Sequence, residues 1–210
     1  MQPTVFFNSI IIEAPRKRIY KRLGYRQGIT RIPSERESEV EKYISEALSL
    51  IKLQGVGRRL PVWWKNDHQV ILADGAGDEV FKSRRLSRFF GECREALLMG
   101  ATAGIDVTAA IAEDAGGNRL TRGVVFDATA SEMVDASLDW IMSYFARELR
   151  RENKMLTEKR FSAGYGDFLL ENQLKVFRLL ELERIGVKIT ESFVLIPEKS
   201  VTAIAGIREK

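Results

Sequence analysis

The sequence has 210 residues, of which 45% are hydrophobic and 30% charged, a composition typical of folded globular proteins. Its single cysteine, Cys93, excludes an internal disulfide and a cysteine-rich metal site, and its single histidine, His68, excludes a histidine metal triad. The 33 basic and 29 acidic residues leave a net charge of +4, too small to indicate a nucleic-acid partner. No apolar run reaches the roughly 20 residues that span a bilayer, so we expect no membrane segment and a cytoplasmic location.

The spacing of apolar residues in the first half of the chain predicts short strands mixed with helices. In chain order we expect a strand at 5–12, a basic helix or turn at 16–26, a helix from 34 stopped by a glycine at 55, a hairpin pairing 62–64 with 70–72, and a buried strand at 95–102. Ser34 and Glu37 have the spacing of a capping box, in which two side chains satisfy the first free amides of a helix.

The second half predicts more helix. We expect a short helix at 105–114, a long helix between 124 and 153, a glycine-rich turn from 160, a helix at 171–185 ended by a glycine at 186, and extended stretches at 187–196 and 200–207. Pro197 and its neighbours would join the last two as adjacent antiparallel strands. Because strands and helices do not alternate steadily, the pattern favours an α+β fold over a doubly wound parallel sheet.

Residues 70–78 superficially resemble the first motif of Rossmann-type methyltransferases, in which glycines after a strand let the backbone approach the cofactor. Only Gly75 and Gly77 are present, the third glycine position holds Glu79, and no second strand ends suitably in an acidic residue. We therefore expect an ordinary turn here. A Rossmann-like S-adenosylmethionine-dependent methyltransferase is kept as an alternative function.

The turn that begins at Arg160 holds groups able to bind an anion and a flat ring. The guanidinium of Arg160 can hold a carboxylate bidentately. Gly164 has no side chain, so a ligand can approach its peptide, and Tyr165 can stack on a ring or face a cation. Asp139, on the predicted long helix, could neutralise a positive group of the ligand. These residue types alone also fit an exposed loop with a structural glycine.

The longer run from Arg160 to Gln173, followed by the segments 181–186, 188–193 and 200–202, resembles the activation domain of vitamin B12-dependent methionine synthase, particularly its stand-alone forms. The similarity is strong over residues 135–205 and weaker upstream. It implies one C-shaped α+β domain over 1–210, with a bent, mainly antiparallel sheet flanked by helices, and allows a helical extension within 1–60.

The resemblance implies that S-adenosylmethionine is the cofactor and that one group of residues binds it: Arg160, Ala163, Gly164, Tyr165 and Asp139. It implies no catalytic residue and no metal site in this chain. In the family, the module docks on the cobalamin domain after inactivation to cob(II)alamin. The methyl group of S-adenosylmethionine and an electron from flavodoxin or a similar reductant then restore methylcobalamin.

The same resemblance implies that the chain is a component of methionine synthase activity and not a complete enzyme. It carries no fused cobalamin, folate or homocysteine module, so we expect it to act in trans on a methionine synthase core, or another corrinoid protein, that holds the cobalamin. Longer family members continue past the equivalent of Lys210 with a tyrosine-containing segment that closes over the cofactor, so we expect either a lower affinity for the cofactor or a site that a partner completes. A non-catalytic corrinoid-protein interaction module is the other alternative.

Overall fold

The computed structural model describes residues 3–26, 28–75 and 77–210, which leaves Ala76 of the Rossmann-like run outside the described residues. Its helices are α1 (Arg16–Arg22), α2 (Ser34–Leu50), α3 (Arg84–Phe90), α4 (Ile105–Gly116), α5 (Leu120–Arg151) and α6 (Asn172–Leu180), the last followed by a 3-10 turn, η1 (Leu182–Ile185). Its strands are β1 (Val5–Phe7), β2 (Gln54–Asn66), β3 (Gln69–Ala73), β4 (Asp78–Lys82), β5 (Glu95–Thr102), β6 (Lys154–Leu156), β7 (Lys188–Ile189), β8 (Leu195–Ile196) and β9 (Ser200–Glu209).

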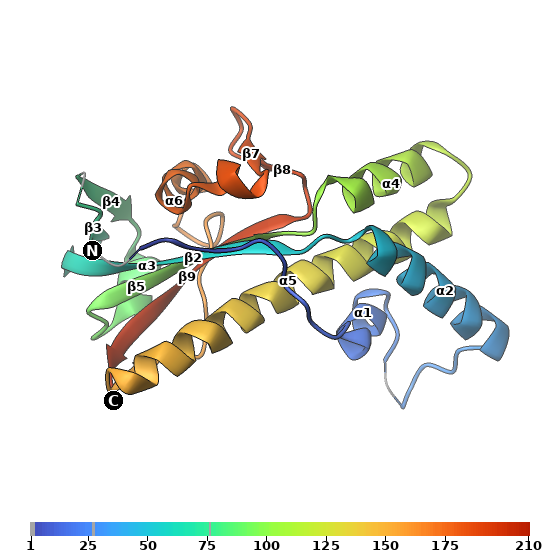
Figure 1. Ribbon diagram of the computed structural model, residues 1–210, viewed down its shortest axis with the longest axis horizontal. Coiled ribbons are helices and arrows are strands. Elements are labelled where there is room, and N and C mark those ends of the chain that lie inside the picture. The colour runs from blue at the N-terminus through green and yellow to red at the C-terminus, as the bar shows by residue number, and fades with distance from the viewer. Residues whose placement is uncertain (1–2, 27, 76) are drawn as a thin grey trace.

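The main sheet is open and antiparallel. Its strands run in the order β4-β3-β2-β5-β9-β6, and β1 pairs with the first part of β2 (Figure 1). The 13-residue strand β2 changes partner along its length, because β1 pairs with residues 55–57 and β3 with residues 62–66. The β2–β3 pairing contains a register shift between Val62 and Trp64. The expected α+β class is confirmed.

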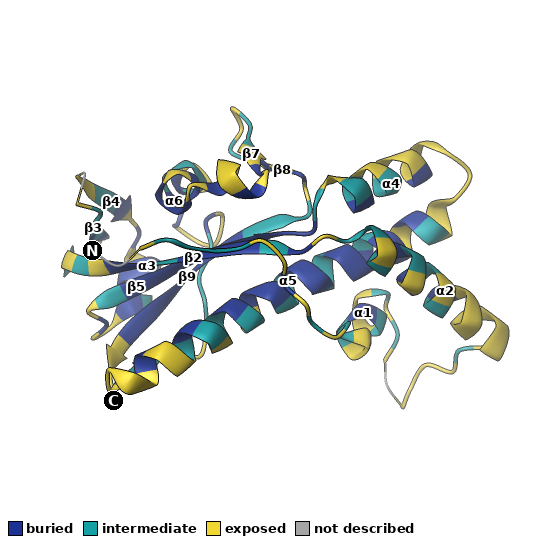
Figure 2. Cartoon of the chain, viewed as in Figure 1, coloured by how far each residue is buried: buried dark blue, intermediate teal, exposed yellow. Residues whose placement is uncertain are grey.

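The two faces of the sheet are covered by different elements. Along β5, Leu97 and Met99 point into a core shared with α5, while Ala96 and Leu98 point into a second core shared with α3, α6 and η1. This alternation is the period of two expected for a strand buried on both faces. Figure 2 shows the buried stripe of α5 running along the sheet.

Two glycines let α5 approach the sheet closely. A side chain at Gly57 would overlap the ring of Phe145, and one at Gly55 would lie 2.8 Å from Cδ1 of Ile141. Phe145 and Ile141 are buried on the sheet-facing side of α5. The helix therefore packs its large side chains directly onto the β2 backbone.

The N-terminal part of α5 extends beyond the sheet, where α1, α2 and α4 gather around it (Figure 1). A small separate core there joins buried residues of three helices: Ile19 of α1, Val40 and Ile44 of α2, and Val125 and Ala128 of α5. Thus α5 is the element common to the sheet region and this helical end.

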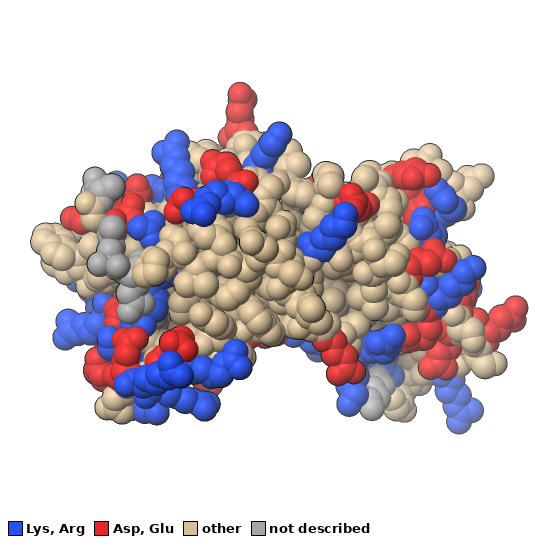
Figure 3. All heavy atoms as spheres, in the orientation of Figure 1, with Lys and Arg blue, Asp and Glu red and all other residues tan. Residues whose placement is uncertain are grey.

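Charged side chains concentrate toward the two ends of the molecule, and a broad uncharged area crosses the middle of the face in Figure 3. Within the part of the chain that the structure describes, no helix combines the length and the apolar character needed to cross a membrane.

Most predicted elements are present, including the 62–72 hairpin, the strand at 95–102, the helix from Ile105 and the long helix, which begins four residues earlier than expected, at Leu120. The basic stretch forms α1, and the N-terminal strand is limited to Val5–Phe7.

The predicted start of α2 at residue 34 is confirmed, but its predicted cap and its predicted end were wrong. Ser34 is the first helical residue rather than the cap, Pro33 precedes it, and no side-chain cap bond forms, so the Ser34–Glu37 capping box is absent. The helix also ends at Leu50, not at Gly55. Ile51 is already extended and the amide of Lys52 donates to the carbonyl of Ala103, so the chain joins the sheet before it reaches the glycine.

Two predictions near the C-terminus were also wrong. The helix at 171–185 is interrupted at Glu181, which has a left-handed φ of 54°, and continues only as the 3-10 turn. The segment 187–196 folds on itself as the β7–β8 hairpin and does not pair with β9. Instead β9, which carries buried side chains on both faces, lies between β5 and β6.

Candidate functional site

The turn that begins at Arg160 is fixed against the edge of β9. Leu156 pairs with Ile207 and Phe161 pairs with Ile204, so the four residues 157–160 lie opposite only two residues of β9, 205 and 206. Ser162, the residue after Phe161, is also fixed to β9, because its hydroxyl donates to the carbonyl of Thr202 at 2.8 Å. The backbone of the predicted cofactor turn is therefore positioned by the sheet.

Glycine is needed at the centre of the turn. Gly164 has φ +90°, a conformation that other residues rarely adopt, and its amide donates to the carbonyl of Phe168 at 2.7 Å. Ala163 is nearly buried, whereas Tyr165 is 68% exposed, so the ring of Tyr165 is available for stacking. The turn thus presents one buried residue, one open backbone position and one accessible aromatic ring.

The side chain of Arg160 leaves the turn and reaches α5. One terminal nitrogen donates to Oδ1 of Asp139, and the other donates to Oδ1 of Asp135 at 2.5 Å. Asp135 and Asp139 are four residues apart, so they lie on the same side of α5. The Arg160 side chain is only 20% exposed, and its guanidinium is held by two carboxylates.

A second arginine shares both carboxylates. Arg18 of α1 donates to Oδ2 of Asp139 at 2.8 Å and to Oδ2 of Asp135 at 3.1 Å, and it also contacts Glu132. Burial opposes ionisation of Asp139, but the hydrogen bonds from Arg160 and Arg18 outweigh it, so the pKa of Asp139 lies below its ordinary value. The four residues Arg18, Asp135, Asp139 and Arg160 form what we call the arginine–aspartate cluster.

A cavity of about 490 Å³ opens beside the turn. It is lined by residues of the turn, of α5 and α6, of the start of β9, and by one arginine of α3: Arg160, Phe161, Ser162, Ala163, Tyr165, Asp135, Leu138, Gln173, Ser200, Val201, Thr202 and Arg85. Its volume is within the range of small-molecule sites. Gln173 is fixed in the wall, because its amide donates to the carbonyl of Phe193 at 3.0 Å and its oxygen accepts from Thr202 at 3.2 Å.

The donor set fits S-adenosylmethionine. The ligand carboxylate matches the guanidinium of Arg160, its ammonium and sulfonium match the carboxylates of the arginine–aspartate cluster, and its adenine matches the exposed ring of Tyr165. A direct contact with a ligand carboxylate would require Arg160 to exchange part of its bonding to Asp135 or Asp139. Of the predicted residues, Arg160, Ala163 and Tyr165 line the cavity, whereas Gly164 and Asp139 do not. Asp139 is joined to the site through its ion pair with Arg160, and the binding role of all five residues stays a prediction.

Asp167 is a structural residue of the site that the sequence did not single out. Its carboxylate accepts from the Ser83 hydroxyl at 2.6 Å and from the amides of Arg84 at 2.8 Å and Arg85 at 3.2 Å. The hydrogen bond from Ser83 lowers the pKa of Asp167, and the backbone amides add to this effect. The far end of the turn is thereby tied to the start of α3, a contact that becomes visible only in the folded chain.

The Rossmann-like run does not form a cofactor loop. Gln69–Ala73 and Asp78–Lys82 are the two arms of the antiparallel β3–β4 hairpin, and no helix follows directly from its turn. Asp74 forms an ion pair with Arg58 of β2, a structural role. The Rossmann alternative was therefore wrong about the topology that its motif requires.

The fold and the site together define an α+β protein with an open antiparallel sheet, one long helix across a sheet face, and an arginine–glycine–tyrosine turn beside a cavity. No protein-family model matches the chain, and no curated protein sequence matches it. Among solved structures, the chain is similar to the crystal structure of the MetH reactivation domain bound to AdoHcy, with a TM-score of 0.61 and 17% identity, over 94% of this chain and 70% of that chain. The resemblance predicted from the sequence is confirmed at the level of the fold.

Proposed function

We propose that this protein is an S-adenosylmethionine-binding reactivation module for cobalamin-dependent methionine synthase. The observation that carries the proposal is the common fold with a reactivation domain solved with AdoHcy bound, in a chain whose arginine–glycine–tyrosine turn borders a cavity. AdoHcy is what S-adenosylmethionine becomes when its methyl group is transferred.

In this proposal Arg160 binds the methionine carboxylate of the cofactor and Asp139 or Asp135 binds its ammonium. The peptide next to Ala163 and Gly164 contacts the nucleoside, and Tyr165 stacks on it. The chain binds and orients the methyl donor. The corrinoid of the partner receives the methyl group together with an electron from flavodoxin or a similar reductant, which restores methylcobalamin.

We further propose that the chain acts in trans in the cytoplasm on a methionine synthase core or another corrinoid protein that holds the cobalamin. The test of this role mixes the chain with a cob(II)alamin-loaded core, a reductant and S-adenosylmethionine and follows the absorption spectrum of methylcobalamin. A spectrum that does not change when the chain is added would overturn the reactivation role.

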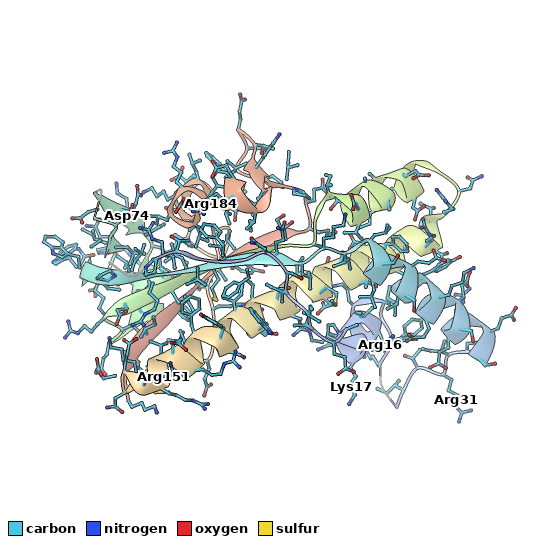
Figure 4. All side chains as sticks on the ribbon, in the orientation of Figure 1. Arg16, Lys17, Arg31, Asp74, Arg151 and Arg184 are labelled. Carbon is cyan, nitrogen blue, oxygen red and sulfur yellow. The ribbon has the colours of Figure 1, made fainter. Side chains whose placement is uncertain are left out.

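Cofactor binding is tested separately by calorimetry with S-adenosylmethionine and AdoHcy. Arg160→Ala should weaken binding by about 2–3 kcal/mol, the loss of a charged hydrogen bond. Arg151→Ala is the matched control, because Arg151 lies at the far end of α5 with a side chain that is 80% exposed (Figure 4). Equal affinity in wild type and Arg160→Ala would refute the proposed site. If the chain binds the corrinoid protein without binding S-adenosylmethionine, it is the non-catalytic interaction module instead.

A further inference from the structure

A second cavity, of about 600 Å³, lies between α1 and the loop that leads to α2. Figure 4 shows this part of the molecule, with Arg16 and Lys17 on α1 and Arg31 across the loop, close to the start of α2. The cavity is separate from the turn at Arg160, and nothing in the proposed function uses it. We call it the α1 cavity.

Five cationic side chains line the α1 cavity, namely Arg16, Lys17, Arg18, Lys21 and Arg26, against a single carboxylate. Arg16 and Arg18 have acidic partners, on α2 and α5 respectively. Among the residues that the structure describes, Lys17, Lys21 and Arg26 form no ion pair. The cavity therefore holds an excess of positive charge that the fold itself does not neutralise.

The spacing of the two lysines concentrates this charge. Lys17 and Lys21 are four residues apart on α1, so their side chains project from the same side of the helix. Like charges at this spacing oppose helix formation. An anion bound between the two ammonium groups would remove the repulsion, and phosphate oxygens are strong acceptors for lysine and arginine.

The other wall of the cavity is aromatic and polar. The rings of Tyr20 and Tyr25 lie with their centroids 5.7 Å apart, tilted by 56°, and Ile32 adds an apolar contact. The hydroxyl of Thr30 accepts from the amide of Arg26 at 3.0 Å, so its own proton is available to a ligand oxygen. A phosphate group alone would use the cations and leave this aromatic surface unoccupied.

We propose that the α1 cavity binds a nucleoside diphosphate, with the phosphates on Lys17, Lys21 and Arg26 and the nucleoside against Tyr20 and Tyr25. The volume is within the range of small-molecule sites. Arg18 lines this cavity and also donates to Asp139 of the arginine–aspartate cluster, so it connects the two sites without lining the cavity beside the turn. The inference does not rest on the proposed function, because it requires neither S-adenosylmethionine nor a corrinoid.

The test is calorimetric titration of the full chain with ADP, pyrophosphate and adenosine. ADP should bind with a saturable signal, more tightly than pyrophosphate or adenosine. The double variant Lys17→Ala/Lys21→Ala should weaken ADP binding by roughly tenfold per lysine. The matched control is Lys52→Ala/Lys188→Ala, which removes two exposed lysines outside the cavity and should leave the affinity unchanged.

Further variants separate the contributions and the sites. Tyr25→Leu should weaken ADP but not pyrophosphate, and Arg160→Ala should leave ADP binding unchanged; circular dichroism checks that each variant is folded. Three results would overturn the proposal: no saturable ADP binding, ADP binding insensitive to the lysine pair, or pyrophosphate binding as tightly as ADP.

Discussion

Arg160 and Asp139 form an ion pair that joins the glycine-rich turn to the long helix α5. The sequence assigned these two side chains to opposite charges of one ligand, the arginine to its carboxylate and the aspartate to its ammonium or sulfonium. A zwitterionic ligand bound between Arg160 and Asp139 would replace their ion pair with two new ones, one from Arg160 to its carboxylate and one from Asp139 to its ammonium. The net charge of the site would not change. Arg18 can keep the aspartates paired when Arg160 shifts toward a ligand.

Arg18→Ala should raise the pKa of Asp139 toward the ordinary value of an aspartate, because one of the two cations that stabilise its charged form is lost. Carbon-detected NMR titration of the carboxylate measures this directly. Arg16→Ala is the control, since Arg16 pairs with Glu41 on α2. Identical Asp139 titration curves in wild type and Arg18→Ala would contradict the shared cluster.

Arg122→Ala should destabilise the protein by about 3 kcal/mol, because it leaves the charge of a buried carboxylate poorly compensated. Asp114 is fully buried and accepts two hydrogen bonds from Arg122, at 2.7 and 2.8 Å. Arg119 also pairs with Asp114 but is half exposed, so Arg119→Ala should cost clearly less. Urea unfolding measures the free energy of unfolding of both variants. Equal losses of stability would show that Arg122 is not the main group that compensates the charge of Asp114.

Gly57→Ala should destabilise the fold by about 1–3 kcal/mol, because the added methyl group overlaps the Phe145 ring between β2 and α5. Gly116→Ala, at the end of α4, meets no atom within 4 Å and should be neutral or slightly stabilising. Thermal unfolding measures both. Adding Phe145→Leu to Gly57→Ala should recover part of the lost stability. If it recovers none, overlap with the Phe145 ring is not the cause of the destabilisation.

Glu152→Gln should make the stability of the protein less dependent on pH at the acid end. Hydrogen bonds from Arg59 and Lys154, partly opposed by burial, lower the pKa of Glu152 from 4.5 to about 2. The stabilisation is thus present above pH 4.5 and is lost as the pH falls toward 2. A shift of this size corresponds to about 3 kcal/mol at most, and partial exposure reduces it to about 1 kcal/mol.

The measurement is the free energy of unfolding of wild type and Glu152→Gln from pH 7 down to pH 3. Glu158→Gln, on an exposed loop, is the control. The difference in the free energy of unfolding between wild type and Glu152→Gln should become smaller at the acid end. A difference that stays constant with pH would exclude Glu152 as a source of the pH dependence.

Local patterns predicted most elements but not how they pair. Apolar spacing was sufficient to predict α5, because a single apolar face determines it. It was also sufficient for the β2–β3 hairpin, because a single short turn joins the two strands. The position of β9 was not predictable from Pro197, since β9 pairs edge to edge with β5, which is roughly a hundred positions away in the sequence, and both of its faces are buried. Long-range pairing of this kind leaves no local signal.

The candidate site was predictable in part for the same reason. The turn at Arg160 was predicted because its residues are consecutive. Asp135 could have been found from its spacing of four to Asp139 on a predicted helix. Arg18 could not, because it reaches the site only through the packing of α1. The role of Asp167 could not, because its hydrogen-bond partners lie at the start of the distant helix α3.

The length of α5 has a mechanical consequence. Its 32 residues span about 48 Å, and it is anchored at one end by the glycine-lined contact with β2 and at the other by the core of α1 and α2. Asp135 and Asp139 lie near the middle of the helix, between the two anchors. A partner that displaced the helical end would therefore act, through the rigid body of α5, on the carboxylates that hold Arg160.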